Sequence, residues 1–84
     1  MNQNYKINIS KNALKFIEKQ DTHQRKRILS AIHGLPKGDV KKLKGYEYYR
    51  LRVGDFRIIF TRNDKELIIL VIDIGNRGQV YENI

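Results

Sequence analysis

The sequence predicts an α+β domain with a short N-terminal strand, two helices and then an antiparallel β-meander, in which helices pack on one face of one sheet. Two observations predict this class. In residues 10–35 the apolar side chains recur at spacings of three and four, as in amphipathic helices. From residue 49 onward they alternate with polar side chains, as in half-buried strands. A chain of 84 residues buries too little surface for two cores, so residues 1–84 are expected to form a single domain.

A strand and a first helix are expected at the N-terminus. Residues 5–9 alternate apolar and polar side chains, as a strand with one buried face does. Ser10 suits the N-cap of a helix over residues 11–20. The apolar face of that helix is expected to consist of Ala13, Leu14 and Ile17.

A second helix and a basic connector follow. Asp21, with Gln24 three residues later, resembles a capping box. The helix has an apolar stripe at spacings of three and four residues: Ile28, Leu29, Ala31, Ile32 and Leu35. Gly34 and Pro36 supply the expected stop. Residues 37–45, rich in lysine, are expected to form a basic connector.

Strands are expected in the rest of the chain. Residues 49–53 and 56–60 alternate apolar and polar side chains, and the Gly-Asp pair at 54–55 suits a two-residue hairpin turn. Residues 63–66 turn the chain again. The continuous apolar run at 67–72 is expected to form a central strand that is covered on both faces.

The charge of the chain is unevenly distributed. Lysine and arginine exceed aspartate and glutamate by a formal net charge of +8. The whole excess falls in residues 1–45, whereas residues 46–84 are neutral overall yet contain most of the arginines. This excess points to an anionic partner, with nucleic acid ahead of a membrane surface.

The composition also excludes several kinds of site. The chain has no cysteine, which rules out disulfides and thiolate metal sites. The two histidines, His23 and His33, are expected on the surface, and with the scattered acids they lack metal-ligand spacing, so neither a metal nor a cofactor is expected. No apolar run reaches the ~18 residues of a membrane span, and the polar N-terminus lacks a signal-peptide core. A cytoplasmic protein without a membrane partner is expected.

The expected hairpin places arginines on one face of the sheet. With a two-residue loop, Arg52 is opposite Arg57, and Arg50 lies on the same face. Like charges opposite each other destabilise a sheet unless an anion binds there. Together with Arg77 and Tyr81 from the end of the chain, these side chains would form a pocket for phosphodiester groups and a base. Spacing alone leaves a second interpretation open, in which the arginines serve only solubility and edge protection.

Two further surfaces are expected near these arginines. The connector lysines would attract a polyanion without specificity, although such a cluster is usually only solvated: Lys41, Lys42 and Lys44. Pairing across the second hairpin puts Leu70 and Ile72 on the same face as Arg57. An acidic amphipathic segment of a partner could bury the apolar surface and neutralise the charge there.

Four segments of the chain together resemble one known family. They are YKINISKNALKFIEKQD (residues 5–21), KKLKG (41–45), YRLRVGDFRIIF (49–60) and GNRGQVY (75–81). Their content and order are similar to those of the RelE/ParE superfamily, the toxins of bacterial type II toxin–antitoxin systems. The resemblance covers residues 5–81. It implies a RelE-like fold and a hetero-oligomeric complex with a cognate antitoxin that wraps around the toxin.

For the RelE branch, the resemblance implies a ribosome-dependent mRNA endoribonuclease that inhibits translation, with the 2′-OH of the RNA as nucleophile and no metal. The catalytic positions it implies are Arg57, Arg77 and Tyr81. It also implies that Arg50 and Arg52 bind RNA. Some members have lysine at those two positions, which could act as a base. Arginine does not give up its proton, so Arg50 and Arg52 are expected to act only electrostatically.

Two other functions are compatible with the same residues. The ParE branch shares the fold but acts on DNA gyrase, and it generally lacks the full set of four arginines with Tyr81. The third possibility is a noncatalytic basic module that binds RNA or the ribosome. The retained set of arginines and tyrosine favours RNA cleavage.

Overall fold

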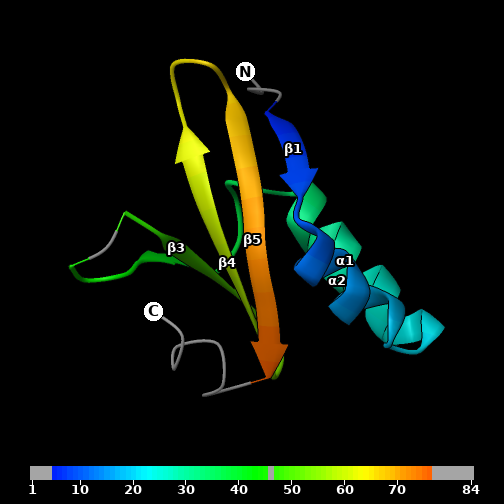
Figure 1. Cartoon of the computed structure of the whole chain (residues 1–84). Coiled ribbons are helices and arrows are strands. Elements are labelled where there is room, and N and C mark those ends of the chain that lie inside the picture. Colours follow the sequence, from blue (N-terminus) through cyan, green and yellow to red (C-terminus); the bar gives the residue numbers. More distant parts are fainter. Residues whose placement is uncertain (1–4, 46, 77–84) are drawn as a thin grey trace.

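The computed structural model describes residues 5–45 and 47–76. Five strands form one sheet in the order β1–β5–β4–β3–β2, and two helices pack on one of its faces (Figure 1). The elements are β1 (Lys6–Ile9), α1 (Lys11–Glu18), α2 (Thr22–His33), β2 (Val40–Lys42), β3 (Tyr49–Val53), β4 (Phe56–Asn63) and β5 (Ile68–Asn76). The predicted α+β class, with helices on a single face, is confirmed.

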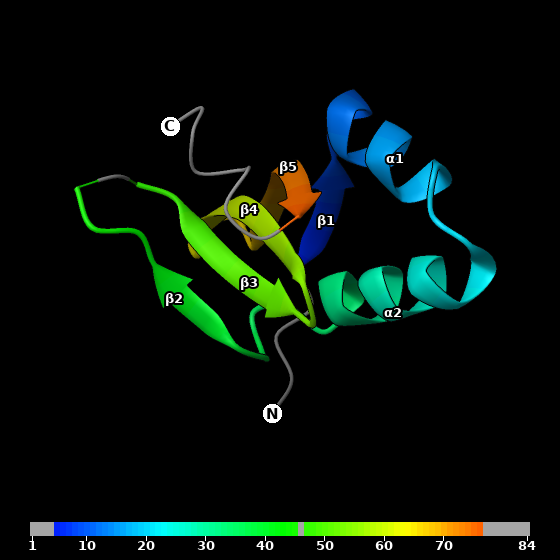
Figure 2. The same ribbon diagram turned by 90° about the horizontal axis from the view of Figure 1, so that it is seen from below.

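The first strand makes the sheet mixed, because β1 lies parallel to β5 whereas the other strand pairs are antiparallel. Ile7 and Ile9 of β1 pack against the core, and Lys6 and Asn8 on the other face are exposed. In Figure 2, which views the molecule from below, both helices lie beside β1 at one end of the sheet and β2 lies at the opposite edge. The alternation of residues 5–9 predicts the strand but not its neighbour.

The cap of α1 also joins the helix to the sheet. The Oγ of Ser10 accepts a hydrogen bond from the Ala13 backbone N–H at 3.1 Å, as predicted for an N-cap. The same hydroxyl donates to the Ile72 carbonyl at 2.8 Å. This one side chain therefore fixes where the helix begins and where it sits on β5.

The expected apolar face of α1 is wrong at one position. Leu14 is 42% exposed, whereas Phe16 packs against the core with its ring edge-on to Phe56 at 5.8 Å between centroids. Residues three and four apart share a helix face, so Phe16 joins the buried Ala13 and Ile17. Leu14 is turned about 100° from Ala13, which places it at the margin of that face.

The second helix follows the prediction closely. Asp21 is its N-cap, and its Oδ1 accepts a hydrogen bond from the Gln24 backbone N–H at 2.8 Å. Ile28 and Ile32 are fully buried against the sheet, and Gly34 ends the helix. None of the described helices is long and apolar enough to cross a membrane.

The hairpin of β3 and β4 has the predicted register. Val53 lies opposite Phe56, and Gly54 at the turn has a φ of 56°, which glycine adopts without strain. The core is formed by the helices and by the side chains on the helix-facing side of the sheet. The buried side chains that β3, β4 and β5 contribute are Leu51, Phe56, Ile58, Phe60, Ile69, Val71 and Ile74.

Two expectations about the sheet are wrong. The connector at 37–45 contains a strand, β2, which pairs with β3 along only a few residues and is too short to show an alternating pattern. The strand at 67–72 is not covered on both faces. Leu70 is 39% exposed, because both helices pack on the other side of the sheet.

A polar cluster holds the start of β1 against the turn between β4 and β5. The Tyr5 hydroxyl donates to Asp64 at 2.7 Å, and Arg62 Nε donates to the same carboxylate oxygen at 2.9 Å. The Arg62 guanidinium also lies over the rings of Tyr5 and Tyr49, at 5.9 and 5.6 Å from their centroids. These contacts connect segments that are far apart in the sequence.

Candidate functional site

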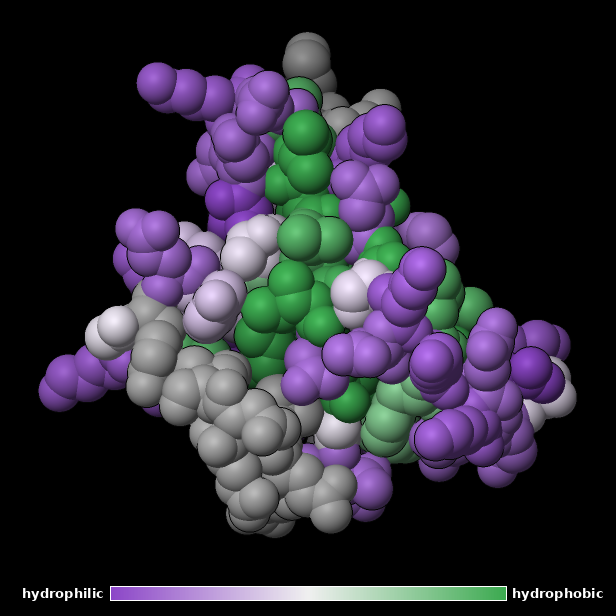
Figure 3. Space-filling model, in the orientation of Figure 1, coloured by the Kyte–Doolittle hydropathy of each residue, from purple (hydrophilic) through white to green (hydrophobic). Residues whose placement is uncertain are grey.

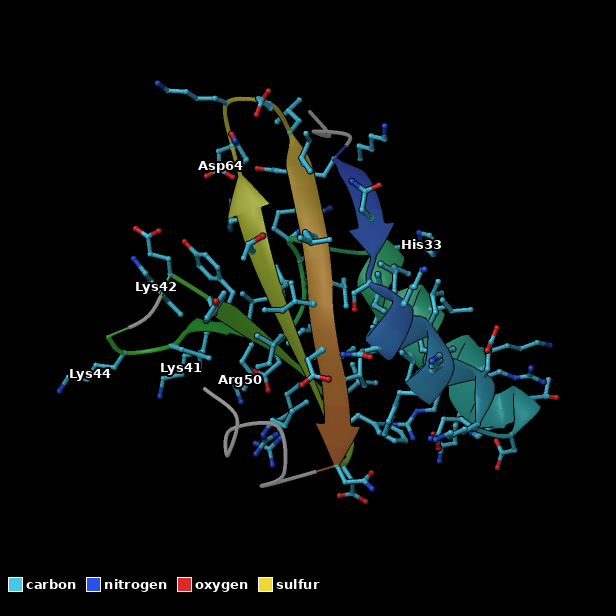
Figure 4. All side chains as sticks on the ribbon, in the orientation of Figure 1. His33, Lys41, Lys42, Lys44, Arg50 and Asp64 are labelled. Atoms are coloured by element: carbon cyan, nitrogen blue, oxygen red, sulfur yellow. The ribbon has the colours of Figure 1, made fainter. Side chains whose placement is uncertain are left out.

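The sheet face opposite the helices carries three of the arginines that the sequence singled out. Arg52 on β3 lies directly opposite Arg57 on β4, and Arg50 lies on the same face two residues before Arg52. Lys41 on β2 is directly opposite Arg50, so it joins them. We call these four residues the arginine face. Figure 4 shows Lys41 and Arg50 side by side at the β2 edge of the sheet.

Several guanidinium nitrogens of this face are buried without a partner. Among the residues that the structure describes, Arg50 Nε and both Nε and Nη1 of Arg57 are shielded from solvent and form no hydrogen bond. A buried charged donor without an acceptor is costly, so such a group usually has a partner in native structures. The geometry therefore suits an anion with several acceptor oxygens, such as a phosphodiester.

The arginine face is only weakly neutralised from within the described part of the chain. The ion pair of Arg50 with Asp39 is long, at 3.4 Å between Nη2 and Oδ1. The Arg50 side chain is 13% exposed, whereas that of Asp39 is 59% exposed, so solvent screens the pair and its contribution is small. The Asp39 carbonyl also accepts from the Arg52 backbone N–H at 3.0 Å, which fixes the entry to β2 beside β3.

The structure separates the connector lysines. Lys41 belongs to the arginine face, but Lys42 is opposite Tyr49, on the side of the sheet that faces the helices. Lys44 lies in the turn after β2, exposed and away from Arg50 (Figure 4). Lys42 lines a separate open hollow of about 590 Å³ whose other members are Gly45, Glu47, Tyr48, Tyr49, Thr61 and Arg62. Of the three lysines, the fold brings only Lys41 to the candidate site.

The two remaining candidate residues, Arg77 and Tyr81, lie outside the described residues. The chain leaves β5 at Asn76, and Gly75 of that strand is directly opposite Arg57. His23 and His33 are exposed on α2, as expected, and Figure 4 shows His33 on the helical side of the molecule. No group of three or more possible metal ligands occurs among residues 5–45 and 47–76.

Sequence reasoning missed an acidic residue on the arginine face. The pairing of β4 with β5 shifts between Ile59 and Phe60, and this irregularity places Asp73 directly opposite Ile59. Strict alternation along β5 would point Asp73 toward the helices. No sequence signal marks the shift, because residues 67–74 read as one apolar run interrupted only by this aspartate.

An apolar stripe adjoins the arginine face along β5. It consists of Ile68, Leu70 and Ile72, of which Leu70 is the most exposed. Figure 3 shows hydrophobic residues following β5 between polar side chains on either side. The predicted neighbourhood of apolar and cationic surface is therefore present in the fold.

The comparisons with known proteins agree with this arrangement. The family model described as "ParE toxin of type II toxin-antitoxin system, parDE" matches residues 7–81. No curated protein sequence matches significantly.

Solved structures of RelE toxins share the fold. The archaeal RelE–RelB complex from Pyrococcus horikoshii OT3 contains a chain 29% identical, with a TM-score of 0.75 and coverage of 92% of this chain and 99% of that one. The RelB–RelE complex from Methanococcus jannaschii contains a chain that is 30% identical, with a TM-score of 0.71 and coverage of 92% of this chain and 98% of that one. A chain of the intact E. coli RelBE complex, 21% identical with a TM-score of 0.69, has the same fold over 89% of this chain and 99% of that one.

The family model and the solved structures thus agree over nearly the whole chain. The chain belongs to the ParE toxin family of the RelE/ParE superfamily and is a toxin of a type II toxin–antitoxin system.

Proposed function

We propose that this toxin is an endoribonuclease that cuts mRNA on the ribosome and thereby inhibits translation. The observation that carries the proposal is the set of buried, unpartnered guanidinium nitrogens on Arg50 and Arg57. They project from paired strands of one sheet, so their positions are set before any ligand arrives. A phosphodiester supplies the acceptors that these donors lack.

RNA brings its own nucleophile to such a site. The 2′-OH next to the scissile phosphate must be aligned with phosphorus, and the extra negative charge of the transition state must be stabilised. In the proposal Arg57 and Arg77 contact the non-bridging oxygens, with Arg77 nearest the leaving 5′ oxygen. Arg50 and Arg52 hold the neighbouring RNA backbone. Tyr81 contacts a nucleobase or takes part in proton transfer. The arginines supply the charge stabilisation, so no metal has a role.

The ribosome enters the proposal for two reasons. The site contains no histidine among its candidates, so the protein alone is expected to cut free RNA poorly. The lysine-rich first half of the chain, which holds the whole +8 excess, would steer the toxin toward ribosomal RNA. The 5′ products are expected to end in a 2′,3′-cyclic or 3′-phosphate, and the 3′ products to begin with a 5′-OH.

A cognate antitoxin is the second expected partner. Both archaeal relatives were solved as complexes of RelE with RelB. In this chain the apolar stripe lies beside the arginine face, which suits an acidic amphipathic segment that covers both. We infer that such a segment, from the product of a neighbouring gene, silences the toxin.

Inhibition of DNA gyrase is the competing function, and the ParE family match is the observation that favours it. A third outcome is RNA binding without cleavage. One experiment separates them: the toxin and its Arg77→Ala and Tyr81→Phe variants are added to a translating extract, where mRNA 5′ ends are mapped, and to a DNA supercoiling assay. Codon-phased cuts that disappear in the variants support the proposal. Loss of supercoiling without cuts indicates gyrase, and translation arrest with neither effect indicates a binding module.

A further inference from the structure

The irregular pairing of β5 with β4 changes which side chains reach the arginine face. Phe60 is opposite Val71, but the preceding residue Ile59 is opposite Asp73, so Ile72 is an extra residue in β5. Such a bulge reverses the inward and outward alternation beyond it. Ile74, which strict alternation would leave on the open face, is only 4% exposed within the core. Asp73 is moved to the open face by the same shift.

The bulge completes a row of side chains across four strands. Lys41 is opposite Arg50, Arg50 is opposite Ile59, and Ile59 is opposite Asp73: the row is Lys41, Arg50, Ile59 and Asp73. Neighbouring strands are about 4.8 Å apart, so the backbones of Arg50 and Asp73 are separated by roughly 10 Å, with the buried Ile59 between them. Arg57 lies on the same face, two residues before Ile59 in β4. Arg50 and Asp73 therefore flank Ile59 on the same face of the sheet, with a cation on one side and a carboxylate on the other.

The carboxylate of Asp73 is not used by an ion pair within the described part of the chain. One oxygen, Oδ1, accepts a hydrogen bond from the Ile74 backbone N–H at 2.9 Å, and this bond holds the side chain at the bulge. The other oxygen has no such bond among the described residues. Asp73 is half-buried, so its position is fixed while one oxygen is left for a ligand.

We propose that Asp73 is the general base of the RNA cleavage reaction, an inference that rests on the proposed function. Its free carboxylate oxygen takes the proton of the 2′-OH as the 2′ oxygen forms a bond to phosphorus. The bond from phosphorus to the 5′ oxygen breaks, and the leaving oxygen takes a proton from water. Protonated Asp73 then returns its proton to the solvent. Arginine cannot fill this role, because it does not give up its proton at neutral pH.

The isosteric variant Asp73→Asn separates chemistry from structure. Asparagine retains an oxygen that can accept from the Ile74 N–H, so the bulge and the fold are kept, but it cannot take up a proton at neutral pH. Cleavage of mRNA in a stalled ribosome complex is measured in single turnover with saturating toxin, across a range of pH. We expect a fall of about 10²- to 10⁴-fold in rate with unchanged affinity for the complex. The cleavage rate of the wild type should rise as the pH is raised from acid toward neutral, and the cleavage rate of Asp73→Asn should not show this rise.

Two further variants complete the test. Asp73→Glu, which keeps a carboxylate, should retain more activity than Asp73→Asn, whereas Asp73→Ala should lose both activity and some thermal stability. Full activity of Asp73→Asn would overturn the inference, as would a loss of affinity equal to the loss of rate, since that pattern marks a structural or binding role. If the wild-type toxin cuts no mRNA, the proposed function itself fails. Equal cutting by wild type and Asp73→Asn rejects only the role of Asp73.

Discussion

Arg52 and Arg57 lie directly opposite each other on β3 and β4, so two like charges occupy one cross-strand pair of the sheet. Such a pair destabilises the folded protein by about 0.2–1 kcal/mol in the absence of an anion. Arg52→Gln should therefore raise the free energy of unfolding by a few tenths of a kcal/mol in a urea titration and weaken RNA binding at the same time. Lys26→Gln on the exposed surface of α2 is the matched control, with little effect on either. A less stable Arg52→Gln protein would contradict this account.

The separation of the connector lysines predicts different effects on RNA binding. Lys41 is beside Arg50, whereas Lys42 is on the helix-facing side of the sheet. Replacing one phosphate-contacting lysine lowers the slope of log affinity against log salt by about 0.7 for a single-stranded RNA. We expect this change for Lys41→Gln and not for Lys42→Gln, measured with a short single-stranded oligonucleotide. Equal changes in the two variants would show that the sheet face does not decide which lysine contacts RNA.

Two exposed leucines offer a controlled test of the antitoxin surface. Leu70 belongs to the apolar stripe and is 39% exposed, and Leu14 on α1 is 42% exposed. Complete burial of an exposed leucine side chain contributes about 1.5–3 kcal/mol, so covering the exposed 39% of Leu70 contributes about 0.6–1.2 kcal/mol, which corresponds to about three- to sevenfold in affinity. Leu70→Asp should weaken antitoxin binding by at least this factor in calorimetry, since the new charge also repels an acidic segment. Leu14→Asp should bind like the wild type, and the reverse ranking would place the antitoxin elsewhere.

The cluster of Tyr5, Arg62 and Asp64 predicts a dependence of stability on pH. Hydrogen bonds from Tyr5 and Arg62 lower the pKa of Asp64 in the folded protein. The resulting stabilisation is complete above the pKa of the unfolded chain, near 4, and is lost as the pH falls through the folded value. The difference in melting temperature between wild type and Asp64→Asn should therefore shrink as the pH drops below about 4. Glu18→Gln, at an exposed position of α1, is the control that should show no such trend.

The same cluster also makes stability depend on pH in alkali, where a contribution is lost as the pH rises. The hydrogen bond to Asp64 is the main cause of the raised pKa of Tyr5. A raised pKa means that the neutral phenol is favoured in the folded state, so this contribution is lost as the pH rises through the folded value. Tyr5→Phe should remove that loss. Because the cluster is exposed, both effects should be small, and a large shift would point to a buried group instead.

Local features of the fold could be predicted from the sequence. Ser10 and Asp21 cap their helices with their own side chains, and the two-residue turn at Gly54 fixes the register that places Arg52 opposite Arg57. Each of these depends on interactions within a few residues. The placement of Arg50, Arg52 and Arg57 on one face follows directly from that register, whereas Lys41 joins them through β2, which was not predicted.

Non-local features could not be predicted. Nothing near residues 6–9 indicates that their partner is β5, more than 60 residues away in the chain. The bulge at Ile72 depends on how β5 fits between β1 and β4, and strict alternation along β5 would put Asp73 on the opposite face from the one it occupies. The sequence therefore predicts that Arg50, Arg52 and Arg57 share one face of the sheet, but it does not indicate that Asp73 lies beside them.

The central claim is that the arginine face cleaves mRNA, and one measurement tests it most directly. Purified toxin and its Arg57→Gln and Arg25→Gln variants are added to a translating extract, and the new 5′-hydroxyl ends of a defined mRNA are mapped and counted. Arg57 has buried, unpartnered nitrogens, whereas Arg25 on α2 hydrogen-bonds Thr22 on the helical surface. We predict codon-phased ends for wild type and Arg25→Gln, and a loss of about 10²-fold or more for Arg57→Gln. Undiminished cleavage by Arg57→Gln, or the absence of new ends with the wild type, would contradict the account.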